Sequence, residues 1–150
     1  MKIWVDADAC PRPIKEVLFK TAIRRQLSMT LVSNQELWVP ESELIDNLLV
    51  PKGFDVADEE IIRMLSEGDL VITADIPLAA VVVKKGAHGI DFRGDVYHEE
   101  NIQTRLATRD LMAQLRDIGL EGGGPPPFNA KDRQTFVNSL DRLLTRLLKV

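Results

Sequence analysis

Aspartates stand where apolar segments end, and these are positions from which a carboxylate can do chemistry. Asp6 and Asp8 follow the apolar run IWV, and Asp75 follows the run LVIT. Asp55 and Asp58 are three residues apart at the start of a predicted helix, so both can face the same side. Gathered carboxylates repel one another, and a hard cation such as Mg²⁺ or Mn²⁺ relieves that repulsion. The five aspartates are therefore candidate ligands of a divalent metal, and Asp6, Asp8 and Asp75 are the candidate catalytic residues.

A metal site of this kind can activate water and neutralise charge on a phosphodiester, in a one-metal or a two-metal form. A structural role is the alternative interpretation. Asp55, Asp58 and Asp75 all stand where an acid caps a helix or favours its dipole, and Asp8 could cap the helix that follows it. Asp6 has no such helix to cap, so its place at a strand end favours a functional role.

Apolar strands alternate with amphipathic helices through the first two thirds of the chain. Strands are expected at 2–6, 29–34, 69–73 and 88–92, and helices after Pro11, at 56–68 and at 76–86. Residues 44–50 fit either the end of a helix or a strand. This alternation predicts an α/β fold with a mostly parallel sheet flanked by helices. The carboxyl ends of such strands form the crevice in which sites are found.

The pattern after Asn101 is helical only. Residues 102–118 and 136–148 predict two amphipathic C-terminal helices, with the Gly/Pro segment 121–129 between them. We therefore expect one domain over 1–150, with a helical extension over about 99–150. The 136–148 stripe should pack onto the domain or across a homodimer, because leaving it exposed would create a large apolar patch.

The composition is typical of an ordinary globular protein and argues against secreted and membrane proteins. The chain has 150 residues, is 45% hydrophobic and 28% charged, and contains one cysteine, so no internal disulfide can form. Neither a signal peptide nor a membrane span is predicted, and we expect a cytoplasmic protein without membrane contact. The net charge of −4 argues against a generally basic nucleic-acid-binding surface. Without the five aspartates the charges nearly balance, so a local basic rim remains compatible with the composition.

Other reactive residues carry weaker signals. Cys10 lacks an evident histidine partner and is interpreted as a small buried residue. His88 and His98 lack metal-ligand spacing. Six basic residues could form a phosphate-binding rim, although solvated helix faces are the simpler interpretation: Lys20, Arg24, Arg25, Lys84, Lys85 and Arg93.

Several blocks of sequence resemble the YaiI/YqxD family of uncharacterised bacterial proteins. They are DADACP at 6–11, KGFDVADEEI at 52–61, GDLVITADIPLA at 68–79 and RGDVYHEENI at 93–102. The resemblance covers nearly the whole chain and carries no established reaction.

The acidic blocks also resemble those of PIN/NYN-type metal-dependent ribonucleases. This likeness implies a PIN-like fold, a Mg²⁺ or Mn²⁺ cofactor and RNA as the partner. Asp6 would be the first ligand, Asp55 or Asp58 the central acid and Asp75 the later one, with Asp8 an additional member.

Two other functions compete with an RNA-directed phosphodiesterase. The IWVDADAC segment also resembles the start of haloacid-dehalogenase-type phosphatases, with Asp6 as nucleophile and Asp8 as acid/base. Thr73 and Lys84 or Lys85 could supply the next two roles, but no convincing acidic pair follows Lys85. The third alternative is a module that binds RNA or a nucleotide without chemistry.

Overall fold

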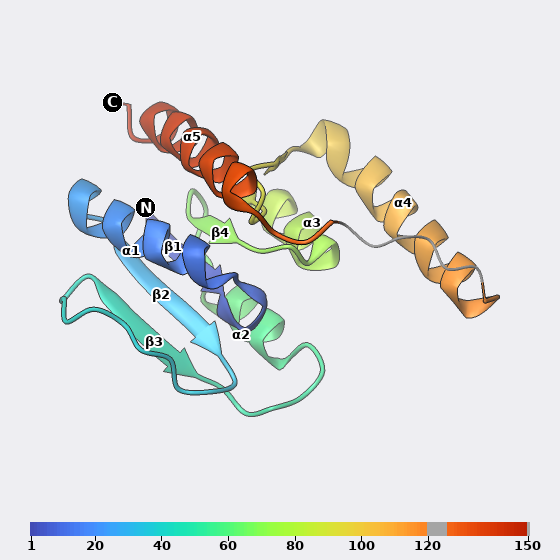
Figure 1. Ribbon diagram of the computed structural model, residues 1–150, viewed down its shortest axis with the longest axis horizontal. Coiled ribbons are helices and arrows are strands. Elements are labelled where there is room, and N and C mark those ends of the chain that lie inside the picture. The colour runs from blue at the N-terminus through green and yellow to red at the C-terminus, as the bar shows by residue number, and fades with distance from the viewer. Residues whose placement is uncertain (120–125, 150) are drawn as a thin grey trace.

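Six strands from the first hundred residues form one sheet at the centre of the protein. The computed structural model describes residues 1–119 and 126–149 (Figure 1). Within them, the strands are β1 Lys2–Asp6, β2 Ser28–Ser33, β3 Ile45–Leu49, β4 Leu70–Ile72, β5 His88–Ile90 and β6 Val96–Tyr97. The helices are α1 Arg12–Arg25, α2 Val56–Met64, α3 Ile76–Lys84, α4 Glu99–Asp117 and α5 Ala130–Leu147, with a 3-10 turn, η1, at Ala7–Ala9.

The strand order is β3-β2-β1-β4-β5-β6, and every neighbouring pair is parallel except β5 with β6. The chain builds outward from β1 to β3 and then returns through α2 to place β4 on the other side of β1. Strand order therefore reverses between β1 and β4. In open α/β sheets the crevice outside the carboxyl ends of the strands at such a reversal is where ligands bind. This confirms the predicted α/β fold with a mostly parallel sheet and two C-terminal helices.

Helices cover both faces of the sheet because successive strand residues point to opposite sides. Ile3 and Val5 belong to the buried cluster formed with α1 and α5. Trp4, between them, packs into the cluster formed with α2 and α3. The crossover after β1, through α1, lies on one face of the sheet, and the crossover after β4, through α3, lies on the other. This opens the crevice between the two strands.

Helix α5 packs onto the domain itself. Its buried residues join the α1 cluster: Phe136, Leu140, Leu143 and Leu144. Leu147 and Leu148 are partly buried against the same cluster. The first of the two expected arrangements of the 136–148 stripe is therefore confirmed, and homodimerisation stays a prediction.

Truncating Phe136 is expected to destabilise the protein strongly. Its side chain is 0% exposed and is among the largest fully buried groups. Removing a buried phenyl ring loses its transfer free energy and leaves a cavity, so Phe136→Ala should lower the free energy of unfolding by about 3–5 kcal/mol. Urea denaturation measures this, with the exposed Arg142→Ala as a control within about 0.5 kcal/mol of the parent. A loss below about 1 kcal/mol for Phe136→Ala would mean that α5 is merely appended.

The structure resolves one open alternative and differs from expectation in two places. Segment 44–50, which fitted either the end of a helix or a strand, contains β3. The helix predicted to run to Gly68 ends at Met64, because Asp69 builds a competing turn in which its carboxylate accepts the Ser66 N–H at 3.0 Å. The two-residue β6 was not predicted, since it is too short for any periodicity and depends on antiparallel pairing with β5. Residues 121–125 of the predicted Gly/Pro segment lie outside the described residues.

Helix α4 packs on α3 through its first turns and then extends away from the sheet (Figure 1). Ile102 at this contact is buried with Ala79 and Tyr97. Among the described helices, none combines the length and apolar character that crossing a lipid bilayer requires.

Candidate metal centre

All five predicted aspartates line one cleft at the carboxyl edge of the sheet. The cleft has a volume of about 260 Å³, and its wall also includes Asn34, Gly53 and Phe54. Asp6 ends β1, Asp8 lies in η1, Asp55 and Asp58 stand at the start of α2, and Asp75 immediately precedes α3. Three chain segments therefore bring carboxylates to the point where the strand order reverses.

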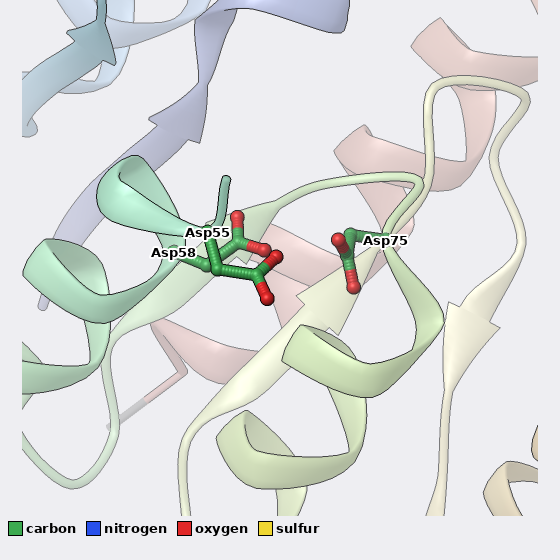
Figure 2. Close-up of side chains that lie close together, drawn as sticks. All are labelled: Asp55, Asp58 and Asp75. Atoms are coloured by element: carbon green, nitrogen blue, oxygen red, sulfur yellow. The ribbon is translucent and has the colours of Figure 1, made fainter. Parts of the chain in front are cut away.

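Three of these carboxylates are close enough to share one cation. Asp55, Asp58 and Asp75 each place an oxygen within 4.8 Å of the others. Figure 2 shows Asp55 and Asp58 side by side on the α2 side of the cleft, with Asp75 across from them. Hard divalent cations prefer oxygen ligands, so the type of donor fits Mg²⁺ or Mn²⁺.

Thr73 links Asp6 to Asp75. Its hydroxyl donates to Asp6 Oδ2 at 2.8 Å and accepts the Asp75 N–H at 2.9 Å. Thr73 is fully buried, and its carbonyl accepts the Tyr97 hydroxyl at 3.0 Å. The sequence indicated Thr73 only within the phosphatase alternative. Its position directly after β4, two residues before an aspartate, is the signal that identifies a positioning residue.

Asp8 is held from the neighbouring strand. Its Oδ2 accepts the backbone N–H of Asn34 at 2.9 Å, and Asn34 directly follows β2. No sequence signal singles out Asn34, because the contact uses its backbone and depends on the parallel pairing of β1 with β2.

The capping interpretation holds for Asp75 and fails for Asp55. Asp75 Oδ1 accepts the Leu78 N–H at 2.9 Å, as an N-cap does. Asp55 occupies the equivalent position before α2, but its side chain makes no capping hydrogen bond. Its φ of 61° is a left-handed conformation that aspartate adopts only at some cost. Two residues before Asp55, the same turn favours glycine. An added Cβ at Gly53 would lie 2.8 Å from Val56 Cγ2, which is too close for a side chain without a shift of Val56.

Burial and the neighbouring acids disfavour the charged forms of Asp6 and Asp58. Burial, then the hydrogen bond and charge of Asp75, then the charges of Asp6 and Asp55 raise the pKa of Asp58 to about 8. Burial also raises the pKa of Asp6, against the hydrogen bond from Thr73, and the charges of Asp75 and Asp8 raise it further. A bound cation would reverse this preference, because it stabilises the carboxylate forms.

The basic rim considered as one interpretation of the sequence does not lie at this cleft. Within the described ranges, no lysine or arginine lines it. Lys85 donates instead to the Ile62 carbonyl at 3.3 Å, Arg25 pairs with Asp141 at 2.6 Å and Arg93 pairs with Asp132 at 2.8 Å.

Cys10 is buried, as the sequence suggested. Burial raises the pKa of its thiol to about 12, with Lys15 lowering it and Asp6 raising it by smaller amounts. A thiol of this kind is a poor nucleophile at neutral pH.

Replacing Thr73 by valine should disturb both stability and the cleft. Valine keeps the shape of threonine but leaves the Asp75 N–H and an Asp6 oxygen without this partner, which should cost about 1–3 kcal/mol. The pKa of Asp6 should rise further, because the hydrogen bond that lowers it is lost. Urea denaturation and NMR titration of the carboxyl carbons measure the two effects. Thr73→Ser keeps the hydroxyl and should retain the parent's Asp6 pKa; equal Asp6 pKa values in Thr73→Val and the parent would remove Thr73 from the site.

Comparison with known proteins identifies close relatives across the whole fold. A protein from Hydrogenovibrio crunogenus is 58% identical over 146 residues, covering 97% of each chain. One from Maridesulfovibrio salexigens is 55% identical over 148 residues, covering 99% of this chain and 98% of its own. One from Shewanella amazonensis is 56% identical over 149 residues, covering 99% of this chain and 100% of its own. All three are described as UPF0178 proteins.

No solved structure matches the chain significantly. The family model described as "Uncharacterized BCR, YaiI/YqxD family" matches residues 4–146, which include every candidate ligand. The resemblance noted in the sequence is therefore confirmed, and the chain belongs to the YaiI/YqxD family.

Proposed function

We propose that this protein is a divalent-metal-dependent nuclease of PIN/NYN type that hydrolyses phosphodiester bonds in RNA. The observation that carries the proposal is the set of carboxylates of Asp55, Asp58 and Asp75, within 4.8 Å of one another at the reversal of strand order, with Asp6 and Asp8 lining the same cleft. A lone, buried Cys10 suits a reducing cytoplasm, which we propose as the compartment.

The energetics of the cleft favour a cation as its ligand. An acidic cleft with no adjacent base would repel a phosphate, and the described part of the chain places no lysine or arginine on its wall. A phosphodiester could approach only with positive charge at the acids. Mg²⁺ or Mn²⁺ held by Asp55, Asp58 and Asp75, with Asp6 beside them, would provide it.

The residues around the cleft have separable tasks. A divalent ion, when bound, supplies Lewis acidity toward the phosphate and a means of activating water. Thr73 orients Asp6 and the backbone of Asp75 toward the ligand. Asp8 is exposed and anchored through one oxygen by Asn34, which suits a carboxylate that orients an attacking water and accepts its proton.

An exposed aromatic side chain on the cleft favours a nucleic-acid substrate over a free phosphate ester. Phe54 is 94% exposed on the cleft wall, directly before Asp55. Aromatic rings stack on unpaired bases, and a ring beside a phosphodiester site gives the neighbouring base a surface to bind.

The phosphatase alternative is not favoured. That chemistry needs a lysine near the nucleophilic aspartate, yet neither candidate lines the cleft. Lys85, directly after the C-terminal end of α3, donates to the Ile62 carbonyl of α2. Lys84 lines a separate cavity between α3 and α4.

The direct experiment is incubation of end-labelled single-stranded RNA with pure protein, in Mn²⁺, in Mg²⁺ and in excess EDTA. We expect cleavage with either metal and none in EDTA. Intact RNA and DNA of varied sequence after incubation with both metals would contradict the proposed function. Cleavage that persists in EDTA would point to a contaminating metal-independent nuclease.

A further inference from the structure

A second groove, beside the acidic cleft, combines positive charge with an exposed aromatic ring. It lies between the first half of α1 and the loop after β2, and has a volume of about 310 Å³. Its lining residues are Arg12, Lys15, Glu16, Phe19, Leu37 and Trp38. None of the six lines the acidic cleft, and the groove plays no part in the chemistry described above.

Trp38 is exposed yet held in place. Its side chain is 77% exposed, although burying an indole is normally favourable. The ring packs at 74° to Phe19, with centroids 6.0 Å apart, and Phe19 is only 7% exposed. This edge-to-face contact with a core residue fixes the indole while most of its surface remains available to a ligand.

The loop that carries Trp38 is fastened to the sheet. Asn47 Oδ1 accepts the Leu37 N–H at 2.8 Å. The amide nitrogen of Asn47 donates to the Leu31 carbonyl at 3.0 Å and to Ser33 Oγ at 2.8 Å. The indole is therefore presented by a connected hydrogen-bond network, which lowers the entropy lost when a ligand binds.

Two cationic side chains line the groove together with Trp38. They are Arg12 and Lys15, and one carboxylate, Glu16, lines the groove with them; Arg12 Nε lies 4.0 Å from Glu16 Oε1. The Arg12 and Glu16 side chains are 91% and 58% exposed, so this ion pair is weak. With two cations and one carboxylate, the groove has a net positive charge. Positive charge next to an exposed aromatic ring matches a nucleotide, which has an anionic phosphate and a flat base.

The groove is joined to the cleft through two chain segments. Helix α1 begins four residues after Asp8, and its first residue is Arg12. Asn34, whose N–H holds Asp8, begins the loop that reaches Trp38 four residues later. A nucleic-acid strand bound at the acids could therefore continue along α1. From Arg12 to Phe19 the helix rises about 10 Å at 1.5 Å per residue, and this is the length of helix that the groove follows.

We propose that this groove binds a flanking nucleotide of single-stranded nucleic acid, with a base stacked on Trp38 and a phosphate paired with Arg12 and Lys15. A flanking nucleotide belongs to a polymer that is cleaved at the acidic cleft, so this part of the inference rests on the proposed function. The ligand is single-stranded because a paired base is stacked on its neighbours and does not offer a free face to the indole. RNA and DNA share this chemistry.

Binding is measured without metal, so that no cleavage occurs. Fluorescence anisotropy follows a labelled 12-nucleotide RNA, the DNA of the same sequence and the corresponding duplex. Trp38→Leu should raise the Kd for the single strands roughly 5- to 150-fold, the range expected for loss of one stacked base. Trp38→Phe should retain part of the affinity. Lys15→Gln should weaken binding and reduce the slope of log Kd against log salt by about one.

Intrinsic fluorescence gives an independent readout. Trp4 is 5% exposed and Trp38 is 77% exposed, so quenching by a stacked base should come from Trp38 and disappear in Trp38→Phe. Ile118→Ala, which removes a side chain that is 72% exposed directly after the last residue of α4, is the matched control and should bind like the parent. The RNA and DNA arms show which polymer binds more tightly.

The outcomes separate this inference from the proposed function. Unchanged Kd values in Trp38→Leu, or duplex binding as tight as single-strand binding, overturn the groove as a nucleotide site even if the parent cleaves RNA. Trp38-dependent binding by a parent that never cleaves RNA supports the groove and overturns the nuclease. Circular dichroism of each variant confirms that it is folded.

Discussion

Replacing Asp75 by asparagine is expected to lower the rate of Mn²⁺-dependent RNA cleavage by about a thousandfold. Catalysis by a bound metal is worth several kcal/mol, and each 1.36 kcal/mol is a factor of ten in rate. Asparagine caps helices as well as aspartate does, so the hydrogen bond from Leu78 should survive the substitution. The variant therefore removes a charge from the cleft while leaving α3 intact.

Single-turnover cleavage of end-labelled RNA measures this effect. Asp117→Asn is the matched control, because it removes one exposed carboxylate from the end of α4 and should cleave like the parent. A thermal melt checks that Asp75→Asn is folded. An Asp75→Asn variant that cleaves within threefold of the parent would mean that Asp75 is a helix cap and nothing more.

The metal-free protein is expected to lose stability as pH rises, and Mn²⁺ is expected to restore it. Asp58 has a pKa raised from 3.8 to about 8, so folding favours its protonated form. That stabilising contribution is complete below about pH 4 and is lost as pH rises through about 8. The raised pKa of Asp6 acts in the same direction. Metal binding should strengthen over the same interval, because the carboxylates must be deprotonated to bind a cation.

Thermal melts at pH 5 and pH 8, with and without Mn²⁺, measure both effects. A ligand at 100 times its Kd adds about 2.7 kcal/mol, which for a domain of this size is roughly 5–11 °C in Tm. At pH 8, Asp58→Asn should raise the Tm of the metal-free protein and blunt the response to Mn²⁺. If this variant instead lowers the metal-free Tm and keeps the full response, Asp58 is a structural residue and the crowding of acids is not the source of metal affinity.

Much of the candidate site could be predicted from local sequence. An aspartate directly after a buried strand must lie at the carboxyl edge of a parallel sheet, and this places Asp6 and Asp75 together once the alternation of strands and helices is recognised. The start of α2 was predictable from KGFDVADEE, because a glycine interrupts the preceding segment and acids favour the first turn of a helix. What local sequence left open was the role of each acid, since a cap and a ligand use the same residue type at the same position.

The parts that could not be predicted depend on contacts between distant segments. For the basic residues at the end of α1, the sequence left open a phosphate-binding rim beside the simpler interpretation of a solvated helix face. A crossover helix runs antiparallel to its strands, so Arg24 and Arg25 lie at the opposite edge and contact α5. Helix α2 ends early because Asp69, from the following turn, accepts the Ser66 N–H. The groove at Trp38 exists only because the loop after β2 passes over α1, which no periodicity encodes.

Calorimetric titration of the metal-free protein with Mn²⁺ at pH 8 tests the central claim most directly, because every step of the proposed chemistry requires a cation at the acidic cleft. The parent and Asp117→Asn should show saturable heats with the same Kd, and both Asp58→Asn and Asp75→Asn should bind at least tenfold more weakly. No saturable heat in the parent, or equal affinity in Asp75→Asn and the parent, would contradict a metal site built from these aspartates.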